Sequence, residues 1–198
     1  MKLKSSHLFF IFLMQIIAVG FFVSKKVNVN MTKTVGQKLD SLNGVYVFYN
    51  GGVANNSGRH LSKMGYNYGL KYQCVEFVKR YYYEALKHQM PNTYGHAKDF
   101  FNPDLIDGTL NRDRNLIQFK NNSKTRPKCD DLLVFNSSLF NKYGHVAIVS
   151  KVLDNAIEII QQNPGPFSSS RVVLEFIKEN GMFVIKNDNV LGWLRKQE

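Results

Sequence analysis

Cysteine is scarce in this chain: among 198 residues only Cys74 and Cys129 occur. Two cysteines exclude a small disulfide-rich scaffold, which needs several pairs. The spacing of His, Cys, Asp and Glu does not match a metal site, and no glycine-rich phosphate-binding loop occurs, so we expect no metal and no other cofactor. Repeats and low-complexity tracts are also missing, while 44% hydrophobic and 13% aromatic content exclude a disordered chain.

Acidic residues are the second shortage, with 15 Asp and Glu against 26 Lys and Arg and a net charge of +11. A basic protein suits an anionic partner, such as a bacterial cell wall or a membrane surface. Nucleic acid is the obvious rival, but the positive charges are scattered and no basic stripe with interleaved aromatics occurs. We therefore expect no nucleic-acid partner, and a solvated basic surface without a specific partner stays an open alternative.

Long hydrophobic runs are absent apart from one, the uncharged stretch from Leu8 to Val23, which lysines flank on both sides. Its charge pattern and length are those of an export signal, and Ala18-Val19-Gly20 offers small residues for cleavage. At sixteen residues it is somewhat shorter than the roughly 20 of a usual membrane-spanning helix. We expect residues 1–26 to be either a cleaved signal peptide or a membrane anchor. The protein is accordingly expected to be exported to the periplasm, cell envelope or extracellular space of a bacterium.

The rest of the chain is predicted to be a linker followed by one domain. Residues 27–42 are polar and are expected to form the linker, and residues 43–198 are long enough for a domain with a sizeable core. The alternation from Gly44 to Tyr49 predicts a strand that ends at a glycine turn. The stretches 53–69 and 91–128 are polar and irregular, and we predict that they are loops, with a short turn of helix from Ala97 to Phe101.

One helix and several strands are predicted inside this domain. Apolar residues recur at helical spacing from Gln73 to about Lys87, which is the strongest helix signal in the chain. Short β-rich runs follow, and they span residues 130–135, 145–153, 157–162, 171–177, 182–186 and 190–194. One helix followed by several antiparallel strands is an α+β architecture.

Cys74 opens the predicted helix and His145 opens a predicted strand, which is the arrangement that a thiol hydrolase needs. The thiolate would be the nucleophile and the imidazole would take its proton. Taken singly, a cysteine at this position could equally be structural, and a histidine at a strand edge is more often structural. Backbone N–H groups and the dipole at a helix N-terminus favour the thiolate, so we expect a pKa well below about 8.5. Gln73 can donate an amide N–H toward a developing oxyanion. A disulfide between Cys74 and Cys129 would silence this chemistry, and the sequence leaves that pairing open.

A third polar group should hold the imidazole, and it should come from the strand after the next hairpin turn. Side chains of a strand alternate between faces. If the turn has an odd number of residues, or if the pairing contains a bulge, Gln161 and Asn163 share the face of His145. A clean two-residue turn puts Gln162 there instead, and Glu158 is a poor candidate by parity in either case. An amide oxygen can accept the imidazole N–H, although it stabilises an imidazolium less than a carboxylate does.

These residues lie in motifs that resemble those of the CHAP domain family, the cysteine- and histidine-dependent amidohydrolases and peptidases. Within that family, the chain is similar to the amidase domain of bifunctional glutathionylspermidine synthetase/amidase. The matching motifs are, in chain order, Gly51-Gly52-Val53, Tyr72-Gln73-Cys74-Val75-Glu76-Phe77, Asp131-Leu132-Leu133-Val134-Phe135, Gly144-His145-Val146-Ala147-Ile148-Val149, Gln161-Gln162-Asn163 and Leu191-Gly192-Trp193. Their combination in this order is specific, whereas any one motif alone would not be.

The resemblance implies a papain-like α+β fold, in which a helix with Cys74 packs on an antiparallel sheet with His145. It also implies that Cys74 is the nucleophile and His145 the general base. The third catalytic position falls on Gln161, where the family often has an acid, and Asn163 would support the same site. The likeness runs from about Asn43 to Trp193, so we expect the chain to lack the ATP-dependent synthetase half of the bifunctional enzymes.

Three functions are compatible with these features. The first is an exported cysteine amidase or endopeptidase that cleaves an amide bond in peptidoglycan peptides through an acyl-enzyme; export and the basic charge favour it. The second keeps the chemistry but takes glutathionylspermidine or a related polyamine conjugate as substrate, as the resemblance implies. The third is a cell-wall-binding module with weakened catalysis, which the amide side chain of Gln161 suggests.

Overall fold

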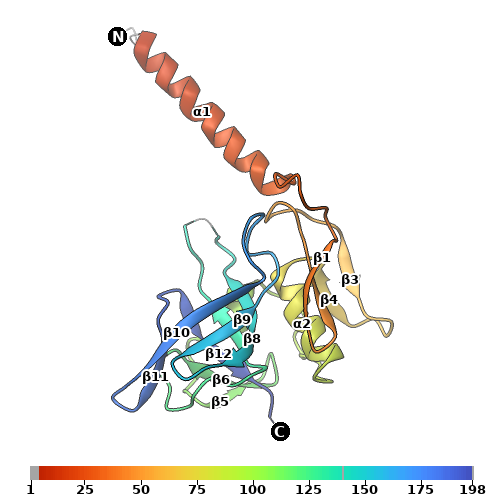
Figure 1. Cartoon of the computed structure of the whole chain (residues 1–198), viewed down its shortest axis with the longest axis vertical. Helices are drawn as coiled ribbons and strands as arrows, with labels where there is room; N and C mark the ends of the chain where they lie inside the picture. The colour runs from red at the N-terminus through yellow and green to blue at the C-terminus, as the bar shows by residue number, and fades with distance from the viewer. Residues whose placement is uncertain (1–4, 140, 198) are drawn as a thin grey trace.

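Eight antiparallel strands form the main sheet in this computed structural model, which describes residues 5–139 and 141–197 (Figure 1). The strand order is β11-β10-β9-β8-β7-β12-β6-β5. In chain order the strands are β5 (Thr109–Asn111), β6 (Leu116–Lys120), β7 (Leu132–Phe135), β8 (His145–Val152), β9 (Ala156–Ile160), β10 (Arg171–Glu179), β11 (Met182–Ile185) and β12 (Val190–Arg195). Most strands that follow one another in sequence are paired. The exception is β12, which does not pair with β11 but lies between β6 and β7 and pairs with both.

The other elements of the described chain are two small antiparallel sheets, β1-β2 and β3-β4, and three helices. In chain order these elements are α1 (Ser5–Lys26), β1 (Lys38–Leu42), β2 (Val45–Phe48), β3 (Arg59–Leu61), β4 (Asn67–Leu70), α2 (Cys74–Glu84) and the 3-10 helix η1 (Ala97–Phe100). Because α2 contacts β2, β4 and β8, it joins the small sheets to the main one. A helix packed on a mostly antiparallel sheet is an α+β arrangement, consistent with the papain-like fold expected from the sequence.

The helix α2 forms because apolar side chains recur along it at helical spacing. Its fully buried apolar side chains are Phe77, Val78, Tyr81 and Tyr82. Gln73 is the N-cap, and the helix ends at Glu84, earlier than the predicted end near Lys87. Lys87 has a φ of 52°, a left-handed conformation that an α-helix cannot continue through.

The main sheet is buried on both faces in its centre, since successive side chains of a strand point to opposite sides. In β7, Leu132 and Val134 belong to the core cluster that includes α2, whereas Leu133 lies in a second cluster around Trp193. These three side chains of β7 and that of Trp193 are fully buried. Burial of apolar area stabilises a fold by about 25 cal/mol per Å², so a strand packed on both faces is firmly held. The neighbouring strand β8 carries His145 at its first position.

The segment that was expected to be a linker, residues 27–42, makes ordered contacts with the domain. Its second half contains β1, which pairs with β2. Ahead of β1, Asn30 is buried and donates its side-chain N–H to Pro166 O at 2.9 Å. Folded contacts therefore begin before residue 43. The polar composition concealed them, because polar side chains are buried readily once their hydrogen bonds are satisfied.

The turn of helix expected from Ala97 to Phe101 is present as η1, but the two stretches that were predicted to be loops also contain strands. Residues 53–69 include β3 and most of β4, and residues 91–128 include η1, β5 and β6. Strand β6 lies inside the main sheet, between β12 and β5. The apolar pattern of β6 is interrupted by Gln118, which is buried, exchanges hydrogen bonds with Asn102 and accepts one from Asn111 Nδ2. A buried amide in a short strand explains why the sequence pattern did not predict it.

Outside the sheets, α1 extends away from the rest of the chain (Figure 1). It is long and apolar enough to cross a membrane from His7 to Lys26, and none of that span is buried; a signal sequence near the N-terminus has the same properties. The helix α1 is therefore compatible with either a signal or an anchor.

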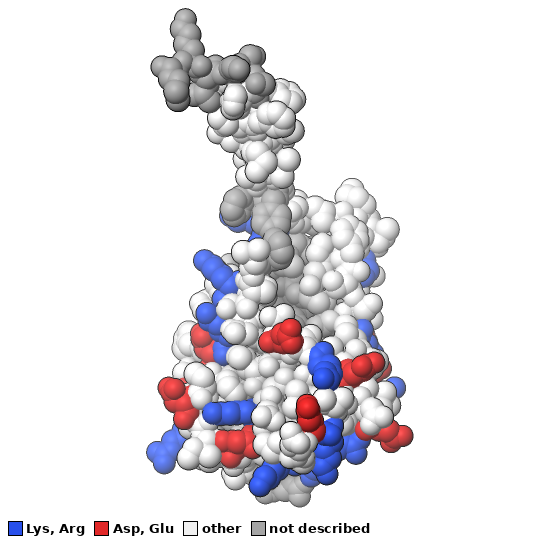
Figure 2. Space-filling view, turned by 90° about the vertical axis from the view of Figure 1, so that its left-hand side faces the viewer, with Lys and Arg blue, Asp and Glu red and all other residues white. Residues whose placement is uncertain are grey.

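On the face drawn in Figure 2, Lys and Arg side chains are interspersed with Asp and Glu and form no continuous basic stripe.

Candidate active site

Cys74 is the first residue of α2 and lies partly buried against the core cluster. A tight turn after β4 delivers the chain to this point: the Gln73 N–H donates to Leu70 O at 3.2 Å. Between them Tyr72 has a φ of 65°, which is uncommon for a bulky residue. Backbone strain of this kind is found where a structure must hold a side chain in one place. Here it brings a thiol to the N-terminus of a helix.

The thiol of Cys74 is neutral in this environment. Burial raises the pKa of Cys74 to about 11, although the backbone N–H groups of Val146, Val75 and Cys74 itself lower it. The sequence-based prediction of a pKa well below 8.5 is therefore wrong for the protein without substrate. The N–H groups at the helix start act in the expected direction, but removing the thiolate from water costs more than they return.

His145 follows a glycine that the local backbone requires. Gly144 has a φ of 74°, and a Cβ atom there would lie 2.5 Å from Phe135 O, the carbonyl oxygen of the strand alongside. The imidazole of His145 is partly buried, and its Nε2 lies 3.0 Å from Gln161 Oε1. Burial lowers the pKa of His145 to about 4, and the hydrogen bond to Gln161 opposes that shift. The imidazole is consequently neutral at physiological pH.

Cys74 packs against the core cluster that contains Val146, the residue directly after His145. The helix that begins at Cys74 contacts the strand that begins at His145. A thiol can pass its proton to a neutral imidazole within hydrogen-bond reach when it attacks a substrate.

Gln161 faces His145 because the pairing of β8 with β9 contains a bulge. The turn between the two strands is a two-residue turn, with Leu153 N bonded to Ala156 O, which by itself would put Gln162 on the face of His145. The register shifts between Val149 and Lys151, so that Ser150 is the extra residue. One extra residue exchanges the two faces of a strand. Of the two alternatives left open by the sequence, the structure therefore has the bulge.

Gln73 and Asn163 are brought together beside this site. Asn163 Nδ2 donates to Gln73 Oε1 at 2.6 Å and to Val53 O at 2.9 Å. Gln73 Nε2 donates to Asn55 O at 2.8 Å and to Val53 O at 3.3 Å. Both amide hydrogens of Gln73 are thus engaged with loop carbonyls, so the expected oxyanion donor is not free in this structure. The pair instead holds the loop at residues 53–55 against the start of α2.

A buried ionic cluster under the site was not predicted from the sequence. Glu76 is 1% exposed, and its carboxylate accepts hydrogen bonds from Arg80 Nε at 2.6 Å and His60 Nδ1 at 2.7 Å. Its other oxygen accepts Gln162 Nε2 at 2.7 Å, and Gln162 also donates to Gln73 O. Burial raises the pKa of Glu76, but the hydrogen bonds from His60 and Arg80 lower it by more than burial raises it. The pKa of Glu76 therefore lies below its ordinary value.

This cluster fixes α2 relative to the end of β9, because Glu76 and Gln162 belong to the two segments that carry Cys74 and Gln161. The available signal in the sequence was the spacing of Glu76 and Arg80, four residues apart on a helix. Such pairs are common on exposed faces, so the spacing alone does not reveal a buried cluster.

Neither cysteine is in a disulfide: Cys74 and the exposed Cys129 are both free. The described residues contain no group of three or more His, Cys, Asp or Glu side chains arranged to hold a metal ion. The candidate site residues named from the sequence offer a thiol, an imidazole and amide groups. Such groups perform nucleophilic acyl transfer.

Comparison with known proteins identifies a family whose sequence model covers the candidate site residues. The sequence model of the CHAP domain matches residues 63–163, which include Cys74, His145 and Gln161. The bifunctional glutathionylspermidine synthetase/amidase of Escherichia coli K12 is 30% identical over 142 residues, which cover 66% of this chain and 23% of that protein. The trypanothione synthetase of Crithidia fasciculata is 30% identical over 95 residues, which cover 48% of this chain and 15% of that protein. The glutathionylspermidine synthase of the same organism is 27% identical over 140 residues, 65% of this chain and 19% of its own length. The matched part thus spans less than a quarter of each relative.

Proposed function

Since the chain belongs to the CHAP domain family, we propose that it is a cysteine amidohydrolase that cleaves an amide bond through an acyl-enzyme at Cys74. Family membership and the amidase named among the relatives support an amidohydrolase. The observation that carries the specific assignment is that α2, which begins at Cys74, contacts β8, which begins at His145, whose Nε2 lies 3.0 Å from Gln161 Oε1. In the proposed reaction, the nucleophile, the base and the orienting group would act together at one site.

In the first half of the proposed reaction, His145 Nδ1, the ring nitrogen not engaged by Gln161, takes the proton of the Cys74 thiol as the sulfur attacks the amide carbonyl carbon. The carbonyl oxygen becomes an oxyanion, which N–H groups at the start of α2 can stabilise because they have no partner within the helix. The C–N bond then breaks, and the imidazolium returns its proton to the departing amine. A thioester at Cys74 remains.

In the second half, His145 removes a proton from a water molecule that attacks the thioester carbonyl. The C–S bond breaks, the thiol regains a proton from the imidazolium, and a carboxylic acid leaves. Gln161 Oε1 accepts the Nε2–H throughout and orients the ring. Because the amide is uncharged, it stabilises the imidazolium less than a carboxylate would, which fits the low pKa of about 4 for His145.

We propose peptides of peptidoglycan as the substrate, and export as the route to it. The helix α1 has the length and apolar composition of a membrane span or signal, and it would carry the domain to the cell envelope or beyond. The net charge of +11 is complementary to an anionic wall surface. Hydrolysis of wall peptides there requires nothing beyond water as the second reactant.

A second candidate substrate is a glutathionyl-polyamine conjugate. The observation that favours it is the 30% identity to a protein named bifunctional glutathionylspermidine synthetase/amidase, over most of this domain. The chemistry at Cys74 would be the same, and spermidine would be the departing amine. The excess of positive charge on this chain makes a polycation the less complementary partner.

The experiment compares the full chain in detergent with its Cys74→Ala variant, and with Cys129→Ala as the matched control for loss of the other thiol. Each protein is incubated with purified peptidoglycan, and released fragments are identified by mass spectrometry. Parallel samples with glutathionylspermidine are assayed for spermidine by chromatography. Fragments that need Cys74 but not Cys129 are expected from peptidoglycan. Activity that survives Cys74→Ala would exclude the acyl-enzyme, and release of spermidine alone would transfer the assignment to the second substrate.

A further inference from the structure

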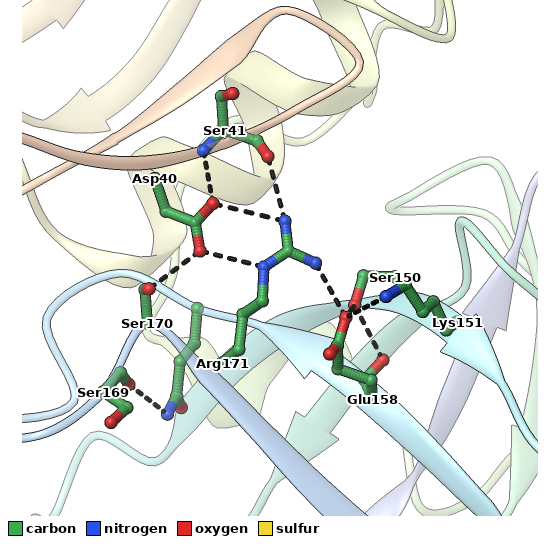
Figure 3. Close-up of polar contacts among 9 residues, drawn as sticks. Asp40, Ser41, Ser150, Lys151, Glu158, Ser169, Ser170 and Arg171 are labelled. Carbon is green, nitrogen blue, oxygen red and sulfur yellow. Dashed lines mark hydrogen bonds and ion pairs between the residues drawn. The ribbon is translucent and has the colours of Figure 1, made fainter.

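The bulge that turns Gln161 toward His145 is tied down by side chains. The hydroxyl of the bulged residue, Ser150, is shared between Glu158 O at 3.1 Å and Glu158 Oε1 at 2.8 Å (Figure 3). Glu158 belongs to β9, the strand whose register the bulge shifts. The side-chain bond therefore spans the irregular pair itself, where the backbone ladder is interrupted.

Arg171 connects this bulge to the N-terminal strand β1. Its Nη1 donates to Glu158 Oε1 at 2.7 Å, while Nε and Nη2 donate to the two carboxylate oxygens of Asp40 at 2.9 and 3.2 Å. Nη2 also donates to Ser41 O at 3.0 Å. A planar guanidinium between two carboxylates holds both in a defined geometry. We call Asp40, Ser150, Glu158 and Arg171 the Arg171 network.

The Arg171 network reaches Gln161 through two serines. Ser170 Oγ donates to Asp40 Oδ2 at 2.8 Å, and Ser170 O accepts the backbone N–H of Gln161 at 2.9 Å. One residue earlier, Ser169 O accepts Gln161 Nε2 at 3.2 Å. Figure 3 shows the Ser169 contact close to Ser170, Arg171 and Asp40. The carbonyl that contacts the Gln161 amide is thus part of a segment anchored by charged side chains.

The Ser169 carbonyl decides which way the Gln161 amide points. A carbonyl oxygen can only accept a hydrogen bond, so the amide atom that faces it must be the NH₂ group. The amide oxygen then faces His145 Nε2, and that nitrogen must carry the hydrogen. Nδ1 of His145 is left unprotonated, as a base requires.

We propose that the Arg171 network is a positioning device for the site: it holds the Ser169 carbonyl against Gln161 and so keeps His145 in the tautomer protonated at Nε2. Its effect on turnover rests on the proposed reaction at Cys74 and His145. Its effect on the tautomer does not, because the tautomer follows from hydrogen bonds that exist without substrate.

The same contact makes glutamine the residue that fits position 161. In a Gln161→Glu variant, an oxygen would replace the NH₂ group and would face Ser169 O with no hydrogen between them. Two acceptors at such a distance repel each other, and the carboxylate would lose one of the bonds that holds the amide. Glutamine at this position is therefore matched to both of its hydrogen-bond partners, so glutamate should bring no gain in rate.

The test uses the full chain in detergent, labelled with ¹⁵N-histidine, at neutral pH. Imidazole ¹⁵N shifts distinguish a nitrogen that carries hydrogen from one that does not, and a His145→Gln variant identifies the relevant signals. The network is broken by Arg171→Gln. The matched control is Lys151→Gln, which removes another positive charge near Glu158 but one that lies 3.9 Å away on an exposed side chain.

In the wild type and in Lys151→Gln, we expect Nε2 to carry the hydrogen in a single tautomer. In Arg171→Gln, we expect a mixture of both tautomers and, on the substrate found for the wild type, a kcat lower by about tenfold with little change in KM. A single wild-type tautomer in Arg171→Gln would overturn the proposal, whatever the activity. A Gln161→Glu variant that is tenfold faster than the wild type would overturn the argument that glutamine fits this position. If the protein turns over neither substrate, the ¹⁵N shifts still report the tautomer of His145. Failure of the proposed function is therefore distinguished from failure of this proposal.

Discussion

The resting protonation state of the site can be read from the pH dependence of Cys74 alkylation. Burial raises the pKa of Cys74 to about 11, against an ordinary value of 9.0. At pH 7 the thiolate fraction is then about 1 in 10⁴ instead of about 1 in 10², and it grows tenfold with each pH unit until the pKa is reached. The pKa of about 4 for His145 leaves no imidazolium near neutrality to stabilise a thiolate.

The assay measures the rate of carbamidomethylation of Cys74 by iodoacetamide from pH 6 to pH 10, with the modified peptide quantified by mass spectrometry. The exposed Cys129 is followed in the same digest as a check on the reagent. We expect the logarithm of the Cys74 rate to rise with a slope of about one over the whole range. A rate that is already high and constant between pH 6 and pH 8 would refute the reasoning, because it would require a thiolate–imidazolium pair in the resting protein.

Three further predictions concern the scaffold of the site. Gly144→Ala should cost at least about 2 kcal/mol of unfolding free energy in urea, since φ is 74° and the new Cβ would lie 2.5 Å from a backbone carbonyl oxygen; an unchanged midpoint would contradict this. Glu76→Ala should destabilise by about 3–5 kcal/mol, because it leaves the buried Arg80 without its carboxylate; calorimetry should show a much lower Tm. The net pKa of Glu76 lies below its ordinary 4.5, so its contribution is present above pH 4.5 and is lost as the pH falls below it. Acid unfolding of the wild type should therefore bind more protons than that of Glu76→Gln.

The parts of the fold with a strong periodic pattern were predictable from the sequence. The spacing of apolar residues after Cys74 predicted α2, and the β-rich runs after Pro127 predicted β7 to β12. Cys74 and His145 were recognisable because each begins one of these elements. Such patterns reflect burial of a face, which sequence periodicity encodes directly.

The register at the site was not predictable, because it depends on a single bulged residue. The local sequence looks the same whether or not the strand pair after the two-residue turn contains a bulge. Only the register of β8 on β9, with Ser150 bonded to Glu158, shows that the bulge is present. Tertiary hydrogen bonding likewise decided that Gln73 contacts the 53–55 loop, and that Gln118 is buried inside β6. The pKa of Cys74 also came out opposite to expectation, since burial is a property of the whole fold.

The central claim is that Cys74 forms an acyl-enzyme on an amide substrate. The most direct measurement is the mass of the intact protein after rapid acid quenching during turnover of peptidoglycan fragments. The account predicts an adduct equal in mass to the acyl portion of the substrate, located on Cys74 and absent from Cys74→Ala. Turnover without any adduct on Cys74, or with full activity in Cys74→Ala, would contradict it.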